Sequence, residues 1–222
     1  MTPDLQRRVQ RYGWDRAASS YEPSWKAQLA PAQEKMLEWA ELGDFEQVMD
    51  VACGTGLVTF AAARQVGPWG KVLATDLSDE MVAYVHAEAH RRKAGQVLAR
   101  QMDKEVLDAP DIFPIVDARM QTDVCPLFFQ LGTGNTLQEE FGDAGFTQVR
   151  ATRLSTTLHY DSPEAACEAA FEGGPVALAS SRFDDPMRTE TRAEYLASIA
   201  PYRTGNAYAI PGEFVVVRGD KA

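Results

Sequence analysis

The sequence predicts an α/β protein with a Rossmann-like, doubly wound and mostly parallel sheet, which is shortened in the middle and ends in an antiparallel pair of strands. Three observations predict this class. Strand-like and helical stretches alternate between residues 45 and 101, a glycine turn follows the first strand, and two strand-like stretches lie in the C-terminal third. The 222 residues allow one domain with its own core and are too few for two large domains.

The alternation begins after a helical N-terminal segment. Polar residues with interspersed aromatic side chains predict one or two short helices over residues 1–22, and an amphipathic pattern predicts a helix over residues 24–41. An apolar strand, a glycine turn and a helix follow, and Ser78 is a suitable N-cap for the next helix. We expect strands at 45–52, 71–75 and 96–101, and helices at 57–65 and 79–93.

After Asp103 the regular alternation stops. Residues 103–112 are too few for a further helix and strand, which together need about 25 residues. Residues 115–121 have a helical pattern, and residues 125–131 are apolar. Beyond these we expect helices at 136–144, 163–171, 176–183 and 185–200, and strands at 146–158 and 213–218.

Composition and charge restrict the class of partner. Hydrophobic residues make up 45% and charged residues 24% of the chain, and the net charge is −10. An acidic chain argues against a nucleic-acid partner, because phosphate contacts need clustered Lys and Arg. It fits a small-molecule substrate. There is no signal-like N-terminus and no apolar run long enough for a membrane helix, so we expect no membrane partner.

Neither the cysteines nor the histidines predict a metal site. The three cysteines are far apart and have no ligand-like spacing, so reduced thiols in a cytoplasmic protein are expected. His86 and His90 are four residues apart, but they lead into Arg91-Arg92-Lys93. A basic end is the usual complement of a helix dipole. His159 is a weak candidate for a general base, and no convincing base is identified. The cysteines are Cys53, Cys125 and Cys167.

The glycine turn and three acids predict a nucleotide-cofactor site. Asp50 ends the first strand and is followed by Val-Ala-Cys-Gly54-Thr-Gly56. The spacing after Gly56 differs from the dinucleotide fingerprint G-x-G-x-x-G, which disfavours a nicotinamide dehydrogenase. A carboxylate at Asp50 suits a ligand with an ammonium group, such as S-adenosylmethionine, better than a pyrophosphate. Asp76, which ends the second strand, is placed to accept the ribose hydroxyls. Asp103, after Met102, is placed for the adenine.

These residues resemble a known family. Val48-Met-Asp-Val-Ala-Cys-Gly-Thr-Gly-Leu-Val-Thr-Phe60 and Gly70-Lys-Val-Leu-Ala-Thr-Asp-Leu-Ser-Asp-Glu-Met81 are similar to class I S-adenosylmethionine-dependent methyltransferases, most closely the ubiquinone/menaquinone C-methyltransferase-like group. The stretch from Tyr12 to Glu22 resembles the lid helix of the family, with Tyr21 over the cofactor. The cofactor-binding set that this resemblance implies is Asp50, Ala52, Gly54, Thr55, Gly56, Asp76, Leu77, Met81, Met102, Asp103 and Tyr21.

The resemblance implies one domain in three parts and a function. The parts are a helical lid (1–42), a cofactor-binding half (43–105) and a substrate-side and C-terminal half (106–222). The implied activity is methyl transfer from S-adenosylmethionine to a small molecule. Two departures matter: Ala52 replaces the first glycine of the family, and strands four and five have no counterpart after Asp103. The missing strands keep open a second hypothesis, a non-catalytic or repurposed cofactor-binding protein, and would leave a strand edge that a homodimer could cover.

Overall fold

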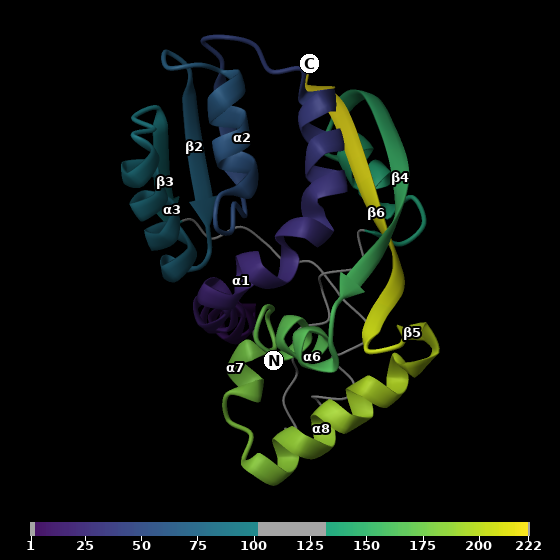
Figure 1. Ribbon diagram of the computed structural model, residues 1–222. Helices are drawn as coiled ribbons and strands as arrows, with labels where there is room; N and C mark the ends of the chain where they lie inside the picture. The colour runs from purple at the N-terminus through teal and green to yellow at the C-terminus, as the bar shows by residue number, and fades with distance from the viewer. Residues whose placement is uncertain (1–2, 102–131, 222) are drawn as a thin grey trace.

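The computed structural model describes residues 3–101 and 132–221, which form two β-sheets with helices around and between them (Figure 1). The first sheet is parallel, with the order β1-β2-β3, and the second is antiparallel, with the order β4-β6-β5. The mixed α/β class predicted from the sequence is therefore confirmed, and the antiparallel strands form a sheet of their own. The helix predicted at 115–121, the apolar stretch 125–131 and the shortened connection after Asp103 lie outside the described residues.

The parallel sheet contains β1 (Gln47–Val51), β2 (Lys71–Asp76) and β3 (Val97–Gln101), joined by α2 (Leu57–Gln65) and α3 (Asp79–Arg92). Residues Val72 and Ala74 of the central strand alternate onto one face, where they pack against these helices. A parallel strand exposes alternate residues to opposite faces, so one face of the sheet holds the core. Its buried residues include Phe60, Ala62, Ala63, Val66, Val82, Val85 and Ala99.

The first strand is shorter than the predicted range 45–52 because its flanking residues have left-handed backbones. Phe45 has φ 69° and Ala52 has φ 58°, and neither conformation can continue a strand. The other two strands match their predicted ranges within one residue. The helix predicted at 57–65 is confirmed, and Ser78 caps α3 by accepting a hydrogen bond from the Met81 amide at 3.1 Å.

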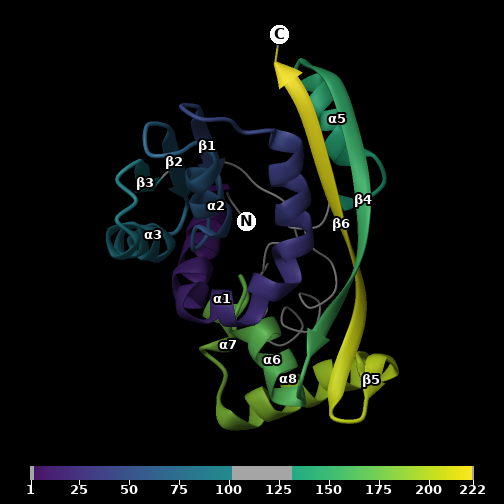
Figure 2. The same ribbon diagram turned by 45° about the horizontal axis from the view of Figure 1, so that its top comes forward.

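The prediction of separate N-terminal helices was wrong, because residues 3–40 form one helix, α1 (Pro3–Ala40), with Pro23 and Pro31 inside it. The helix changes direction along its length (Figures 1 and 2), as prolines in a helix interior cause. Contacts with distant residues hold it together. The Trp25 indole donates to the Gly173 carbonyl at 2.8 Å, and the Gln28 amide pairs with both backbone groups of His159.

The second sheet is dominated by a long hairpin of β4 (Phe146–Tyr160) and β6 (Ala207–Lys221), with the short β5 (Arg203–Thr204) beside β6. Its two long strands exceed the predicted ranges 146–158 and 213–218. The strand β6 continues through Pro211-Gly212, which would normally interrupt a strand. At these two residues β6 pairs only with β4, so its other edge needs no backbone N–H donor.

Helices flank the hairpin. The helix α5 (Thr136–Asp143) precedes β4, and α6 (Pro163–Phe171), α7 (Ala177–Ser180), α8 (Asp185–Ser198) and the 3-10 turn η2 (Ala200–Tyr202) lie between β4 and β5. The α6 prediction is confirmed, whereas the helices predicted at 176–183 and 185–200 are shorter than expected. Figure 1 shows α6 and α7 next to the N-terminal part of α1, away from the parallel sheet.

One edge and one face of the parallel sheet lack a partner among the described residues. No described strand pairs with the outer edge of β1. On the face opposite α2 and α3, Met49 and Val51 are 51% and 53% exposed, and Leu98 is also exposed. Doubly wound sheets normally cover both faces with helices, so the described part of this sheet is incomplete.

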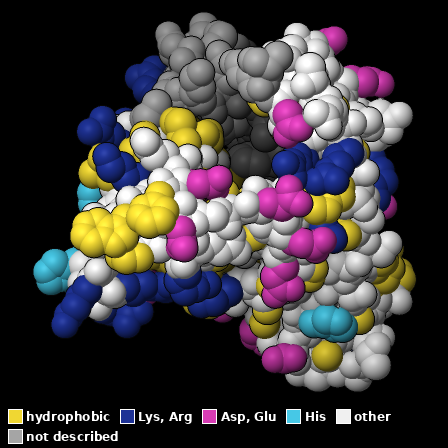
Figure 3. All heavy atoms as spheres, turned by 90° about the horizontal axis from the view of Figure 1, so that it is seen from above, with side chains coloured by type: hydrophobic (Ala, Val, Ile, Leu, Met, Phe, Trp, Pro, Cys, Tyr) yellow, Lys and Arg dark blue, Asp and Glu magenta, His cyan; other side chains and the backbone are white. Residues whose placement is uncertain are grey.

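The described surface carries charges of both signs. Acidic and basic side chains share the face seen in Figure 3 with hydrophobic ones. None of the helices within residues 3–101 and 132–221 has a stretch apolar enough to cross a bilayer.

Candidate functional site

The glycine turn joins β1 to α2 at the carboxyl end of the parallel sheet. Its backbone is left-handed at Ala52, Gly54 and Gly56, where φ is 58°, 54° and 85°. A side chain at Gly56 would place its Cβ 2.8 Å from the Phe60 ring, so no larger residue fits there without movement. The turn leads directly into the N-terminus of α2, where unpaired N–H groups and the helix dipole favour polar ligand groups.

Asp76 holds this turn against the end of β2. One carboxylate oxygen accepts a hydrogen bond from the Gly54 amide at 2.8 Å, and the other accepts from the Ser78 amide at 2.9 Å. Asp76 is only 8% exposed, and burial raises the pKa of its carboxyl group, although the backbone N–H donors oppose that rise. Each oxygen has a second lone pair, so the carboxylate can accept further hydrogen bonds from a ligand.

Asp50 lies on the other side of the turn. Its carboxylate accepts a hydrogen bond from the hydroxyl of Thr59, in the first turn of α2, at 2.5 Å. Burial raises the pKa of Asp50, and the nearby charge of Asp76 adds to the rise. Neither carboxylate has an ion pair with any residue in the described part of the chain. A buried and a half-buried carboxylate side by side without a cation favour a ligand that brings positive charge and hydrogen-bond donors.

Tyr21 places an aromatic ring over the turn. A Cβ at Gly54 would be in van der Waals contact with the Tyr21 ring, at 3.4 Å, so the ring lies directly against the turn. Burial raises the pKa of Tyr21 to about 12, with smaller contributions from Asp76 and Asp50. The ring of Trp14 packs edge-to-face on that of Tyr21, with centroids 5.9 Å apart. The N-terminal helix thus lies against the glycine turn, near both acids.

Asp15 fastens the same helix to the start of α3, and sequence reasoning missed this residue. Its Oδ1 accepts a hydrogen bond from the Ser78 hydroxyl at 2.6 Å and another from the Glu80 amide at 3.3 Å. Hydrogen bonds therefore run from Asp15 through Ser78 and Asp76 to Gly54, underneath Tyr21. The sequence did contain one signal for this role, because Asp15 lies six residues before Tyr21, the expected lid residue.

The remaining residues that the sequence predicted for the site differ in their burial and hydrogen bonding. Thr55 is buried, and its hydroxyl has no hydrogen-bond partner. Leu77 is half-buried directly after Asp76, whereas the Met81 side chain is packed into the interior. The structure thus places Asp50, the turn, Asp76 and Tyr21 together. Met102 and Asp103, expected at the adenine, lie outside the described residues.

Part of the chain is similar to known methyltransferases. Residues 48–126 match the family described as "Methyltransferase domain". Nocamycin O-methyltransferase of Saccharothrix syringae is 32% identical over 114 residues, which are 51% of this chain and 41% of that protein. Demethylmenaquinone methyltransferase of Lactobacillus johnsonii is 37% identical over 67 residues, 30% of this chain and 25% of that protein. The chain spans less than half the length of these curated relatives.

Among solved structures, a SAM dependent methyltransferase from Aquifex aeolicus is 28% identical, with a TM-score of 0.31. The match covers 36% of this chain and 43% of that one.

The match over residues 48–126 supports a class I methyltransferase domain in this part of the chain, with S-adenosylmethionine as its cofactor. The described residues fit this ligand. Its ammonium and ribose hydroxyl groups are hydrogen-bond donors, and the cleft offers two carboxylates, which only accept. The role of each individual residue stays a prediction.

Proposed function

We propose that this protein transfers the methyl group of S-adenosylmethionine to a small-molecule acceptor. The observation that carries the proposal is the pair of neighbouring carboxylates, buried Asp76 and half-buried Asp50, at a glycine turn that lies under Tyr21. The similarity to nocamycin O-methyltransferase, whose name describes an oxygen methyltransferase, supports it.

In this proposal each residue has a defined task. Asp50 holds the ammonium group of the methionine portion, and Gly54 and Gly56 allow the backbone to approach it closely. Asp76 holds the ribose hydroxyls while it keeps its two bonds to the backbone. Tyr21 covers the cofactor from the N-terminal helix. The proposed roles of Ala52, Thr55, Leu77 and Met81 are contacts along the turn and the start of α3, and those of Met102 and Asp103 are contacts to the adenine.

The chemistry needs little from the protein beyond alignment. When bound, S-adenosylmethionine supplies a methyl group on a positively charged sulfur. The chain must hold the acceptor in line and exclude water, which is the main source of rate enhancement for such a displacement. In this proposal the N-terminal helix excludes water by placing Tyr21, against which Trp14 packs, over the glycine turn. We assign no general base.

Two partial similarities bear on the acceptor. The partial similarity to demethylmenaquinone methyltransferase supports a place near the quinone C-methyltransferase-like group for the cofactor-binding part. The similarity to nocamycin O-methyltransferase supports an oxygen acceptor. We therefore propose an acceptor with a ring-bound oxygen or activated carbon, and a cytoplasmic location.

A cofactor-binding protein without transferase activity is the second candidate. The observation that favours it is the incomplete parallel sheet, with the open edge of β1 and the exposed Met49 and Val51. A homodimer that covers this edge remains a proposal, and size-exclusion chromatography tests it.

Calorimetry and methyl transfer separate the two candidates. Titration with S-adenosylmethionine and S-adenosylhomocysteine should show binding of both, and Asp76→Ala should abolish it. Transfer of a labelled methyl group should then be measured across phenols, quinones and amines. Binding with transfer supports the enzyme, binding without transfer supports the second candidate, and no binding of either compound would contradict both.

A further inference from the structure

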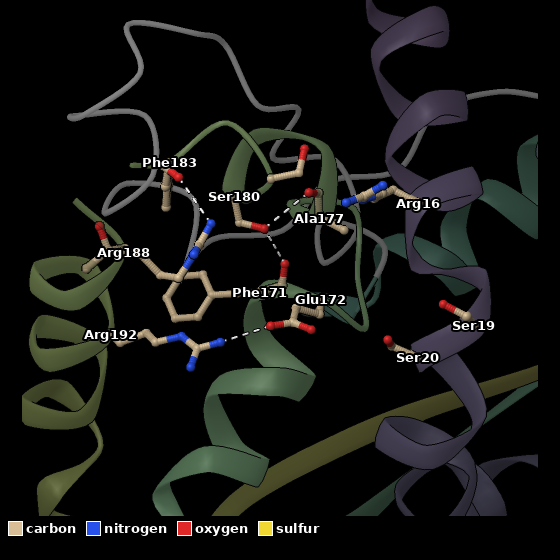
Figure 4. Close-up of a pocket in the computed structure, with 12 residues that line it drawn as sticks. Arg16, Ser19, Ser20, Phe171, Glu172, Ala177, Ser180, Phe183, Arg188 and Arg192 are labelled. Atoms are coloured by element: carbon tan, nitrogen blue, oxygen red, sulfur yellow. Dashed lines mark hydrogen bonds and ion pairs between the residues drawn. The ribbon is translucent and has the colours of Figure 1, made fainter. Parts of the chain in front are cut away.

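A cavity that does not include the cofactor turn lies between α1 and the three helices α6, α7 and α8. Its volume is about 570 Å³, within the range of small-molecule sites. Figure 4 shows Arg16 on α1 facing the cavity from one side and Arg188 and Arg192 on α8 from the other. Successive helix residues are about 100° apart, so Arg16 lies on a different face of α1 from Tyr21.

The charge around this cavity is positive in an acidic protein. Three arginines and a single acid, Glu172, are among its lining residues, although the whole chain has a net charge of −10. Within the described residues, Arg16 has no ion pair and no side-chain hydrogen bond. Arg192 lies 2.9 Å from Glu172, and Arg188 lies 3.3 Å from an Asp185 carboxylate that is 97% exposed. A guanidinium has five N–H donors, so all three arginines keep donors free.

A buried hydroxyl between two of these arginines also lacks a partner. Thr191 is 1% exposed, lines the cavity, and its Oγ1 has no hydrogen-bond partner. It follows Arg188 by three residues and precedes Arg192 by one, so the helix brings Arg188, Thr191 and Arg192 near one another. An unsatisfied buried hydroxyl destabilises a protein, and a ligand acceptor in the cavity would satisfy it.

Aromatic side chains line the cavity beside the α8 arginines (Figure 4). Phe171 and Phe183 line the cavity and belong to one buried cluster with Val176. The volume is several times larger than an inorganic anion needs, and these side chains suit an unsaturated or aromatic body. The cavity therefore combines arginines on two sides with two aromatic side chains beside those of α8.

We propose that this cavity binds a small organic anion, with its carboxylate or phosphate group at Arg16, Arg188 and Arg192 and its apolar body against Phe171 and Phe183. Arginine matches both groups because its planar fork can donate two parallel hydrogen bonds. The bound anion connects α1 to α8 and so braces the helix that carries Tyr21. This site goes beyond the proposed methyl transfer and does not depend on it.

Calorimetry on the full chain at constant ionic strength tests the site. Phenyl phosphate supplies the anion and the ring together, inorganic phosphate supplies the anion alone, and phenol supplies the ring alone. Phenyl phosphate should bind saturably, and both partial probes should bind more weakly. Absence of saturable binding, or equally tight binding of phenol, would overturn the proposal.

Calorimetry on arginine variants tests whether phenyl phosphate binds in this cavity. Arg16→Gln breaks no contact within the described residues and should weaken phenyl phosphate binding about tenfold or more. The matched control is Arg182→Gln, an exposed arginine that does not line the cavity, which should change affinity by less than about twofold. Equal weakening by the two variants would show a bulk charge effect and overturn the site.

Thr191→Val is the second variant. It removes the hydroxyl with little change of shape, so it should weaken phenyl phosphate binding and raise the melting temperature of the free protein. Unchanged binding with a lower melting temperature would contradict the role of Thr191 in the site. S-adenosylmethionine calorimetry on the same samples keeps this result separate from the cofactor proposal.

Discussion

Removal of the Asp15 carboxylate should loosen the N-terminal helix over the cofactor cleft. In the folded protein, Asp15 accepts a hydrogen bond from the Ser78 hydroxyl at 2.6 Å and one from the Glu80 amide at 3.3 Å. Asp15→Ala removes both acceptors, while Asp15→Asn keeps one oxygen. Ser78 still caps α3 in both variants, because its hydroxyl accepts the Met81 amide independently.

The structure sets the expected size of this effect. A hydrogen bond to an ionised group contributes about 1.5–3 kcal/mol, and the longer contact to Glu80 adds little. Because Asp15 is half-buried, we expect Asp15→Ala to lower the free energy of unfolding by about 2 kcal/mol. If cofactor binding requires the docked helix, the affinity for S-adenosylmethionine should fall by up to about thirtyfold. Asp15→Asn should lose about half as much in free energy.

Urea unfolding and S-adenosylmethionine calorimetry measure the two quantities. The matched control is Glu38→Gln, which removes an acid from the same helix and breaks only the exposed pair with Lys35. That control should change stability by less than about 0.5 kcal/mol and leave affinity unchanged. If Asp15→Ala lost stability but bound S-adenosylmethionine as tightly as the unaltered protein, the reasoning that this contact positions the helix for the cofactor would be refuted.

Three further predictions concern the glycine turn and its acids. Ala52→Gly should raise the free energy of unfolding by about 1 kcal/mol, because Ala52 has φ 58°; no gain in urea unfolding would contradict this strain. Gly56→Ala should lower it by about 2–3 kcal/mol, because φ is 85° and its Cβ would lie 2.8 Å from Phe60; unfolding at the same urea concentration would contradict the clash. Asp50→Asn should raise the melting temperature at pH 7 but weaken S-adenosylmethionine binding. Burial raises the pKa of the Asp50 carboxyl group in the folded protein. The contribution of Asp50 to the free energy of unfolding therefore falls as pH rises from its ordinary pKa of 3.8 through the raised pKa. A difference in stability between the variant and the unaltered protein that did not change with pH would refute this.

Local sequence signals predicted the parallel half of the fold well. Strand and helix periods, the glycines and the Ser78 cap are local features, and the observed ends of α2 and α3 follow them. The fused N-terminal helix was not predictable in this way. Pro23 and Pro31 would normally interrupt a helix, and bonds to residues far along the chain, Gly173 and His159, hold it together. The full length of β6 across Pro211 depends in the same way on pairing with β4.

In the candidate site, too, some features follow from local sequence and others from long-range contacts. The sequence by itself determined the glycine turn and the acids Asp50 and Asp76, because the ends of successive parallel strands must meet at one edge of a sheet. Only the tertiary structure decided that Asp76 bonds to the turn, that Asp15 fastens the N-terminal helix to α3, and that Arg16 faces α8 across a cavity. These contacts join residues from 20 to nearly 180 positions apart, and their geometry depends on how whole elements pack against one another, which no local pattern in the sequence encodes.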